Sequence, residues 1–94
     1  MSSTDNCAAL ELSRAESWVV HAALLARIER ETESGNDVNE ELTLLRAVEH
    51  GEYTFDPADL DLLRTTLSTY LVDAPERDRI PGQAMLDEID GAIA

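Results

Sequence analysis

The chain has no lysine, one cysteine and no long apolar run, and each shortage narrows what the protein can be. Cys7 alone can form neither an internal disulfide nor a multi-cysteine zinc site. The longest apolar run is far shorter than the roughly 20 residues that a membrane span needs, and no signal-like segment opens the chain. We therefore expect a cytoplasmic protein with no membrane partner.

Signatures of catalysis are missing as well. The sequence contains no glycine-rich phosphate loop, no Gly-x-Ser-x-Gly elbow and no His-Glu-x-x-His pair. Among 20 Asp and Glu residues, nothing singles out two carboxylates as a catalytic acid and base. We expect neither an enzyme nor a bound cofactor.

The charge balance is the strongest signal in the sequence. The seven basic residues are all arginine, and the net charge is -13. A compact chain with this charge repels itself in dilute buffer, whereas molar salt shortens the Debye length to about 3 Å and screens the repulsion. We interpret the acidic, lysine-free composition as an adaptation to a salt-saturated cytoplasm; an ordinary acidic protein is the alternative. The hydrophobic residues, 44% of the chain, fall in periodic stripes and argue against disorder.

Local start and stop signals predict four helices, over about residues 13–34, 37–50, 56–73 and 81–92. The second of these helices begins at Asp37 or at Asn39. Ser13 with Glu16, and Asp37 with Glu40, have the spacing of capping boxes at the first two helix starts.

The third and fourth helices are each marked by a proline. Asp56 followed by Pro57 is a favoured helix start, and we place the start of the last helix at Pro81. A helical turn that starts at Pro75 is an alternative for the segment before it. The prediction is an all-α fold, a compact bundle of two helical hairpins in one domain over residues 1–94. We expect residues 1–10 to be frayed, with a minor extended pairing between segments 8–12 and 52–55.

The predicted first helix carries apolar residues on two opposite sides. We assign the core stripe to one side: Ala15, Trp18, Val19, Ala22, Leu25 and Ala26. Val20, Leu24 and Ile28 form a second row that a small monomer does not need on its surface. We therefore expect a symmetric homodimer through this second row or through Trp18. A central helix enclosed within a monomer is the alternative.

Two groups of polar residues are candidates for recognition. His21 is a weak metal or ligand candidate, because no second ligand lies four residues before or after it. His50 is explained by a favourable position at the end of the second helix. A charged segment between Pro75 and Pro81 is a candidate docking loop for an unidentified protein partner, or else a solvated connection: Glu76, Arg77, Asp78 and Arg79.

Three segments resemble a family of short, acidic, functionally uncharacterised proteins of halophilic archaea. They are residues 16–25, with Glu16-x-Trp18-Val-Val-His21, then residues 44–51 and residues 70–78. The resemblance implies a lineage and no activity, and it supplies no functional residues.

The function most consistent with the sequence is that of a non-enzymatic, self-associating interaction protein. A ligand- or metal-binding module using His21 is the alternative. An acidic DNA-associated regulator is the third, and we do not expect nucleic-acid binding because no basic patch is visible.

Overall fold

The computed structural model describes residues 7–93, which form four α-helices and two short strands. In chain order these are β1 (Ala8–Ala9), α1 (Arg14–Glu33), α2 (Asn39–Glu49), β2 (Thr54–Phe55), α3 (Pro57–Val72) and α4 (Glu76–Ile93). The predicted all-α class and the minor extended pairing are both confirmed.

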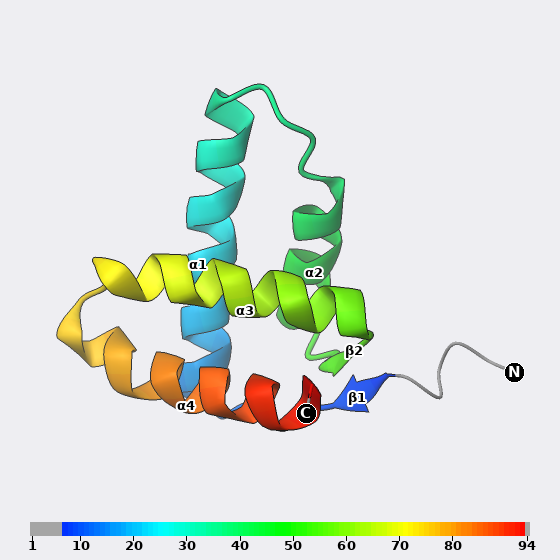
Figure 1. Cartoon of the computed structure of the whole chain (residues 1–94), viewed down its shortest axis with the longest axis vertical. Helices are drawn as coiled ribbons and strands as arrows, with labels where there is room; N and C mark the ends of the chain where they lie inside the picture. The colour runs from blue at the N-terminus through cyan, green and yellow to red at the C-terminus, as the bar shows by residue number, and fades with distance from the viewer. Residues whose placement is uncertain (1–6, 94) are drawn as a thin grey trace, which may run out of the picture.

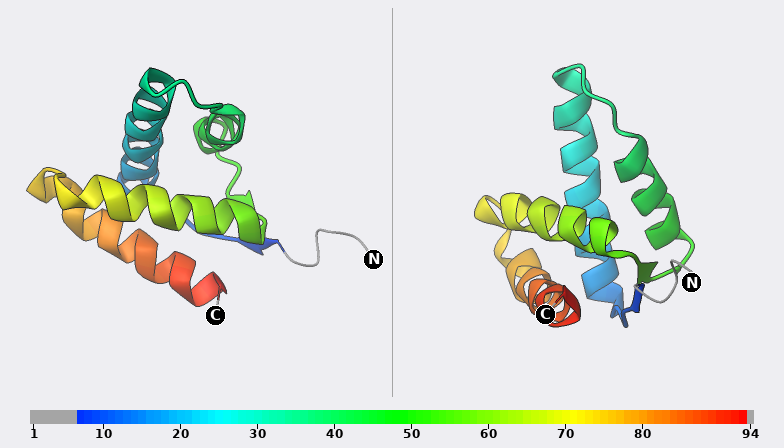
Figure 2. Two further views of the ribbon diagram at one scale, coloured as in Figure 1. Left: turned by 45° about the horizontal axis from the view of Figure 1, so that its top comes forward. Right: turned by 45° about the vertical axis from the view of Figure 1, so that its right-hand side comes forward.

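The helices form two pairs that cross each other (Figure 1). Helix α1 lies beside α2, and α3 lies beside α4, as two further views also show (Figure 2). The two predicted hairpins are therefore present. Helix α1 also contacts both α3 and α4, so it packs against all three other helices.

Capping boxes open α1 and α3. In α1 the Ser13 hydroxyl accepts the Glu16 backbone N–H at 3.1 Å, while Glu16 Oε1 accepts the Ser13 N–H at 2.8 Å. Asp56 and Asp59 exchange the same two bonds at the start of α3, with Pro57 next to the cap. These reciprocal bonds satisfy backbone donors that the first helical turn leaves unpaired.

Helix α2 begins at Asn39, one of the two predicted starts, but without the predicted capping box. Its N-cap is Val38, which makes no side-chain cap hydrogen bond, so the box between Asp37 and Glu40 does not form. Asp37 instead accepts the backbone N–H of Asn39 at 3.0 Å. Since the helix starts one residue later than a box on Asp37 requires, Glu40 lies too early in the first turn to complete one.

Helix α4 starts five residues earlier than predicted, at Glu76, and Pro81 lies inside it. Proline removes one backbone donor, so the carbonyl of Arg77 loses its partner four residues on. Because the Arg77 side chain is 82% exposed, the missing backbone hydrogen bond lies in a turn that faces solvent. The chain between α3 and α4 is therefore only residues 73–75.

The two strands hold the N-terminal segment against the chain between α2 and α3. Ala8 pairs antiparallel with Phe55, and the Leu10 N–H donates to the Tyr53 carbonyl at 2.9 Å. Residues 8–10, expected to be frayed, are thus paired, and the rest of that expectation (residues 1–6) lies outside the described residues. Over residues 7–93 no helix is both long enough and apolar enough to cross a membrane.

One core joins all four helices and strand β2. Its buried members are Val19, Val20, Ala23, Leu24, Leu44, Leu45, Val48, Phe55, Leu60, Leu63, Leu67, Met85 and Ile89. Burial of apolar side chains on this scale is the main favourable contribution to folding.

Candidate functional site

The row of apolar residues first expected to contact a second chain lies inside the protein. Val20 and Leu24 are fully buried, and Ile28 is partly buried against the same core. The expectation of a second chain at this row is therefore wrong, because α2, α3 and α4 together cover that side of α1.

The opposite side of α1 is exposed instead. Trp18 is 68% exposed and Leu25 is 39% exposed, while Ala15 is exposed and Ala22 is half-buried. We call these four residues the outer stripe. Their spacing of three, four and three residues places them along one side of the helix, as in the seam of a coiled coil.

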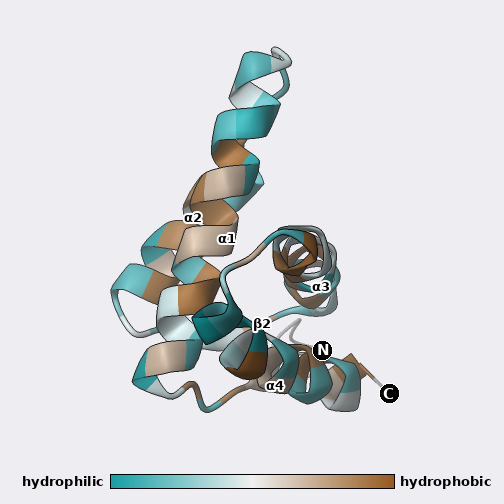
Figure 3. Ribbon diagram, turned by 90° about the vertical axis from the view of Figure 1, so that its left-hand side faces the viewer, coloured by the Kyte–Doolittle hydropathy of each residue, from teal (hydrophilic) through white to brown (hydrophobic). Residues whose placement is uncertain are grey.

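Periodicity predicts that the four residues of the outer stripe belong to the core, and their exposure corrects that prediction. Of the six residues predicted to form the core stripe, Val19 is buried as expected, but the two largest exposed members are Trp18 and Leu25. The core is instead completed by Val20 and Leu24 of the predicted second row. The outer stripe is therefore an exposed apolar side of a helix that packs against all three other helices. Figure 3 shows the ribbon with the left-hand side of Figure 1 facing the viewer. Seen from this side, the C-terminal turns of α1 project beyond α3 and are mostly hydrophilic.

A groove runs beside the outer stripe, where the first turns of α1 and α4 lie near each other. Its volume is about 680 Å³, within the range of roughly 300–1,000 Å³ that is usual for small-ligand pockets. We call it the α1/α4 groove, and it is lined by Arg14, Ala15, Trp18, Val19, Arg77, Asp78 and Pro81. Its surface is mainly apolar, with an arginine contributed by each helix.

The two arginines give this groove a charge unlike that of the whole chain. Within residues 7–93, Arg14 takes part in none of the ion pairs, and Arg77 has only a long contact of 3.8 Å to Asp78. Both side chains are exposed at the groove. On a chain of net charge -13, the groove is therefore a local site suited to an acidic and apolar partner segment.

The candidate docking loop does not exist as a loop. Glu76, Arg77, Asp78 and Arg79 form the first turn of α4. Asp78 is only 6% exposed, and it accepts a hydrogen bond of 2.8 Å from the Tyr70 hydroxyl. Burial, followed by the contact with Asp78, raises the pKa of Tyr70.

Arg79 serves the same turn. Its Nε donates to the Ala74 carbonyl at 3.3 Å, next to the end of α3. Asp78 and Arg79 therefore tie α4 to the preceding segment. Of this charged cluster, Arg77 is the exposed member that lines the α1/α4 groove.

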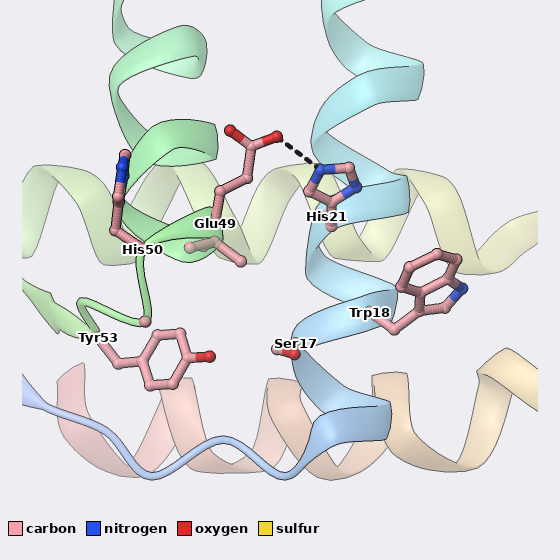
Figure 4. Close-up of a pocket in the computed structure, with 8 residues that line it drawn as sticks. Ser17, Trp18, His21, Glu49, His50 and Tyr53 are labelled. Carbon is pink, nitrogen blue, oxygen red and sulfur yellow. Dashed lines mark hydrogen bonds and ion pairs between the residues drawn. The ribbon is translucent and has the colours of Figure 1, made fainter.

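His21 lies in a second cleft, of about 450 Å³, between α1 and α2. Its Nε2 is 3.0 Å from Glu49 Oε2, and the two side chains point toward each other (Figure 4). His21 also stacks on Trp18, with ring centroids 6.2 Å apart, so it links the cleft to the outer stripe.

The other polar residues of this cleft do not complete a metal site. His50 points away from His21, and its Nδ1 lies 2.8 Å from the Arg46 carbonyl, which can only accept a hydrogen bond. His50 thus caps the end of α2, as predicted. Within residues 7–93 no group of three or more His, Cys, Asp and Glu residues is arranged to hold a metal ion. His21 and Glu49 offer two donors, whereas protein zinc sites use three or four.

Taken together, the fold and this surface define a small four-helix protein with an exposed apolar stripe beside an arginine-lined groove. No feature of the described residues indicates an enzyme. The chain belongs to a family of unknown function, DUF7853, whose model matches residues 10–90. The expected membership of an uncharacterised family is confirmed to that extent, whereas a halophilic archaeal source stays a prediction. No curated protein and no solved structure matches the chain.

Proposed function

We propose that this protein is a non-enzymatic interaction protein that associates with a second copy of itself through the outer stripe of α1. The observation that carries the proposal is the exposure of Trp18, the only tryptophan of the chain, in the middle of that stripe. Tryptophan combines a large apolar area with little conformational entropy, and it is enriched among the residues that dominate binding energy in protein interfaces.

The acidic composition indicates that this association is favoured at high salt. A net charge of -13 opposes the approach of two like-charged chains, and molar salt removes most of that opposition. We therefore propose that the protein works in the salt-rich cytoplasm of a halophile, where apolar contacts decide the association.

Light scattering coupled to size exclusion in 2 M KCl tests the proposal. The unaltered protein should elute with twice the mass of one chain at micromolar concentration, and Trp18→Ser should elute as a monomer. Val72→Ser is the matched control, because Val72 is a 73% exposed apolar residue on α3, outside the stripe and the groove. It should leave the dimer intact.

The fluorescence of Trp18 provides an independent measurement. Its emission should shift to shorter wavelength as protein concentration rises, since the exposed ring becomes buried on association. A protein that stays monomeric at all concentrations up to about 100 μM, with an unshifted emission, would show that the proposal is wrong.

A further inference from the structure

We propose that the α1/α4 groove receives the C-terminal turns of α1 from a second copy, so that two α1 helices pack antiparallel about a two-fold axis. The inference rests on the proposed function and specifies how the second copy docks. It goes beyond association through Trp18, because it names the segment that fills the groove and the charges that pair across the interface.

The outer stripe is complementary to itself when its direction is reversed. Along the helix it reads small, large, small, large: Ala15, Trp18, Ala22, Leu25. An antiparallel copy therefore sets Trp18 against the partner's Ala22, and Leu25 against the partner's Ala15. A parallel copy would set Trp18 against Trp18 and leave the alanines facing each other, which packs poorly.

The antiparallel register also directs the partner's helix along the groove. With the partner's Leu25 beside Ala15, the following turns of that helix continue past the start of α1. These turns project beyond α3 in one chain, so they are available to another (Figures 1 and 3).

The positions of the charged residues also favour the antiparallel register. Glu29 lies one turn beyond Leu25 on the same side of α1, and it is exposed. In the antiparallel register the partner's Ala26 lies opposite Arg14, and the partner's Glu29 follows within one turn, in reach of the long Arg14 side chain at the rim of the groove and with Arg77 beside it. Each arginine then meets an acidic segment in a chain that is otherwise strongly negative, and the two-fold axis repeats the contact.

A different acidic helix would satisfy the arginines equally well, but it has no reason to match the alternation of small and large residues. The reversal of the stripe onto itself therefore favours a second copy as the occupant. Antiparallel packing also brings opposite ends of the two helix dipoles together, which is favourable.

A charge exchange tests the register. Arg14→Glu and Glu29→Arg should each raise the dimer dissociation constant about fivefold in 0.5 M KCl, since each change affects two symmetric exposed pairs. The double variant Arg14→Glu/Glu29→Arg restores the pairing and the original net charge, and its dissociation constant should return to within about twofold of the original. Both positions are exposed, and glutamate is favourable in a first helical turn, so folding should not be compromised.

Arg46→Glu is the control for net charge. Arg46 is exposed on α2, and its substitution changes the total charge by the same amount as Arg14→Glu, away from the stripe and groove. It should shift the dissociation constant much less than Arg14→Glu does.

The outcomes separate this inference from the proposed function. If Trp18→Ser abolishes the dimer but the double variant is no tighter than its parents, the proposed function stands and the antiparallel register is wrong. The register is also wrong if both single variants bind as tightly as the original protein. A monomeric original protein overturns both.

Discussion

The hydroxyl of Thr66 is enclosed in the core without a hydrogen-bond partner among the described residues. The residue is only 2% exposed and lies on α3 beside Leu63 and Leu67. A buried hydroxyl that has lost water and gained no partner destabilises the folded state.

Thr66→Val replaces this hydroxyl with a methyl group of similar shape. We expect it to raise the free energy of unfolding by about 1 kcal/mol, because the desolvated polar atom is removed at little change in packing. Urea unfolding in 2 M KCl measures the change. Thr65→Val makes the same substitution at an exposed neighbour and should change stability by less than about 0.5 kcal/mol. A destabilised Thr66→Val protein would contradict the prediction.

Glu88 on α4 gives a prediction about pH. Burial first, and then the charge of nearby Glu16, raises the pKa of Glu88 above its ordinary value, although the Glu11 backbone N–H partly offsets this. The folded chain therefore holds the Glu88 proton more tightly than the unfolded chain does. Its contribution to stability is full below the ordinary glutamate pKa and falls as pH rises through the raised pKa.

Glu88→Gln should therefore stabilise the protein at pH 7 and lose that advantage at about pH 4, where Glu88 is protonated. The glutamine side chain would keep a carbonyl oxygen for the Glu11 N–H. Urea unfolding at the two pH values measures the difference. Asp87→Asn removes one charge from an exposed neighbour and controls for net charge. An equal effect of both substitutions at both pH values would show that the position of Glu88 has no special effect.

At the scale of helices, a largely buried ion pair joins α1 to α2, in addition to the more exposed contact of His21 with Glu49. Arg27 Nε lies 2.9 Å from Glu41 Oε2, and the Glu41 side chain is only 8% exposed. Arg64 on α3 serves as the exposed counterpart of Arg27, because its ion pairs with Asp61 and Asp90 are largely exposed.

Arg27→Met should cost about 3 kcal/mol of stability, because it leaves the carboxylate of Glu41 buried and unpaired. Arg64→Met should cost less than about 1 kcal/mol. Adding Glu41→Leu to Arg27→Met should recover most of the loss, since no buried charge then remains. Urea unfolding of the four proteins in 2 M KCl measures these differences. If Arg27→Met and Arg64→Met were equally destabilising, the buried Arg27–Glu41 ion pair would contribute no more to stability than the exposed pairs of Arg64.

Features set by neighbouring residues could be predicted at this scale. The boxes at Ser13 and Asp56 depend only on residues three positions apart. Gly35 follows α1 with a φ of 78°, and Gly51 follows α2 with a φ of 75°, a left-handed geometry that glycine adopts at helix ends. The prediction that the last helix starts at Pro81 was wrong. Proline is favoured at a helix start, but α4 begins before it at Glu76.

Features set by tertiary packing could not be predicted. Periodicity fixes the angle between the two rows of α1 but not which row the other helices cover, so the exposure of Trp18 needed the structure. The contact of His21 with Glu49 joins residues 28 positions apart, and no local spacing signals it. The candidate site thus depends on the relative placement of helices, which a single sequence does not specify.

At the scale of the whole molecule, charge is the dominant property. A net charge of -13 is confined within a radius of gyration of 12.8 Å, so the folded chain repels itself more than the expanded unfolded chain does. Raising KCl from 0.1 to 1 M shortens the Debye length from about 10 to about 3 Å and removes most of this difference. The melting temperature should therefore rise by more than about 10 °C over that range and then level off. In a domain of this size, a stability change of one kcal/mol corresponds to a shift of about 4–8 °C.

Two comparisons isolate screening as the cause. Sucrose at matched osmolality stabilises by exclusion from the surface without screening charge, so it should give a smaller rise than KCl. Trp18→Ser should show the same KCl dependence as the original protein, since the repulsion acts within one chain and does not require a dimer. Thermal unfolding followed by circular dichroism at low protein concentration measures all three. A melting temperature that is independent of KCl would mean that the acidic composition does not serve stability in salt, and the proposed halophilic setting would lose its physical basis.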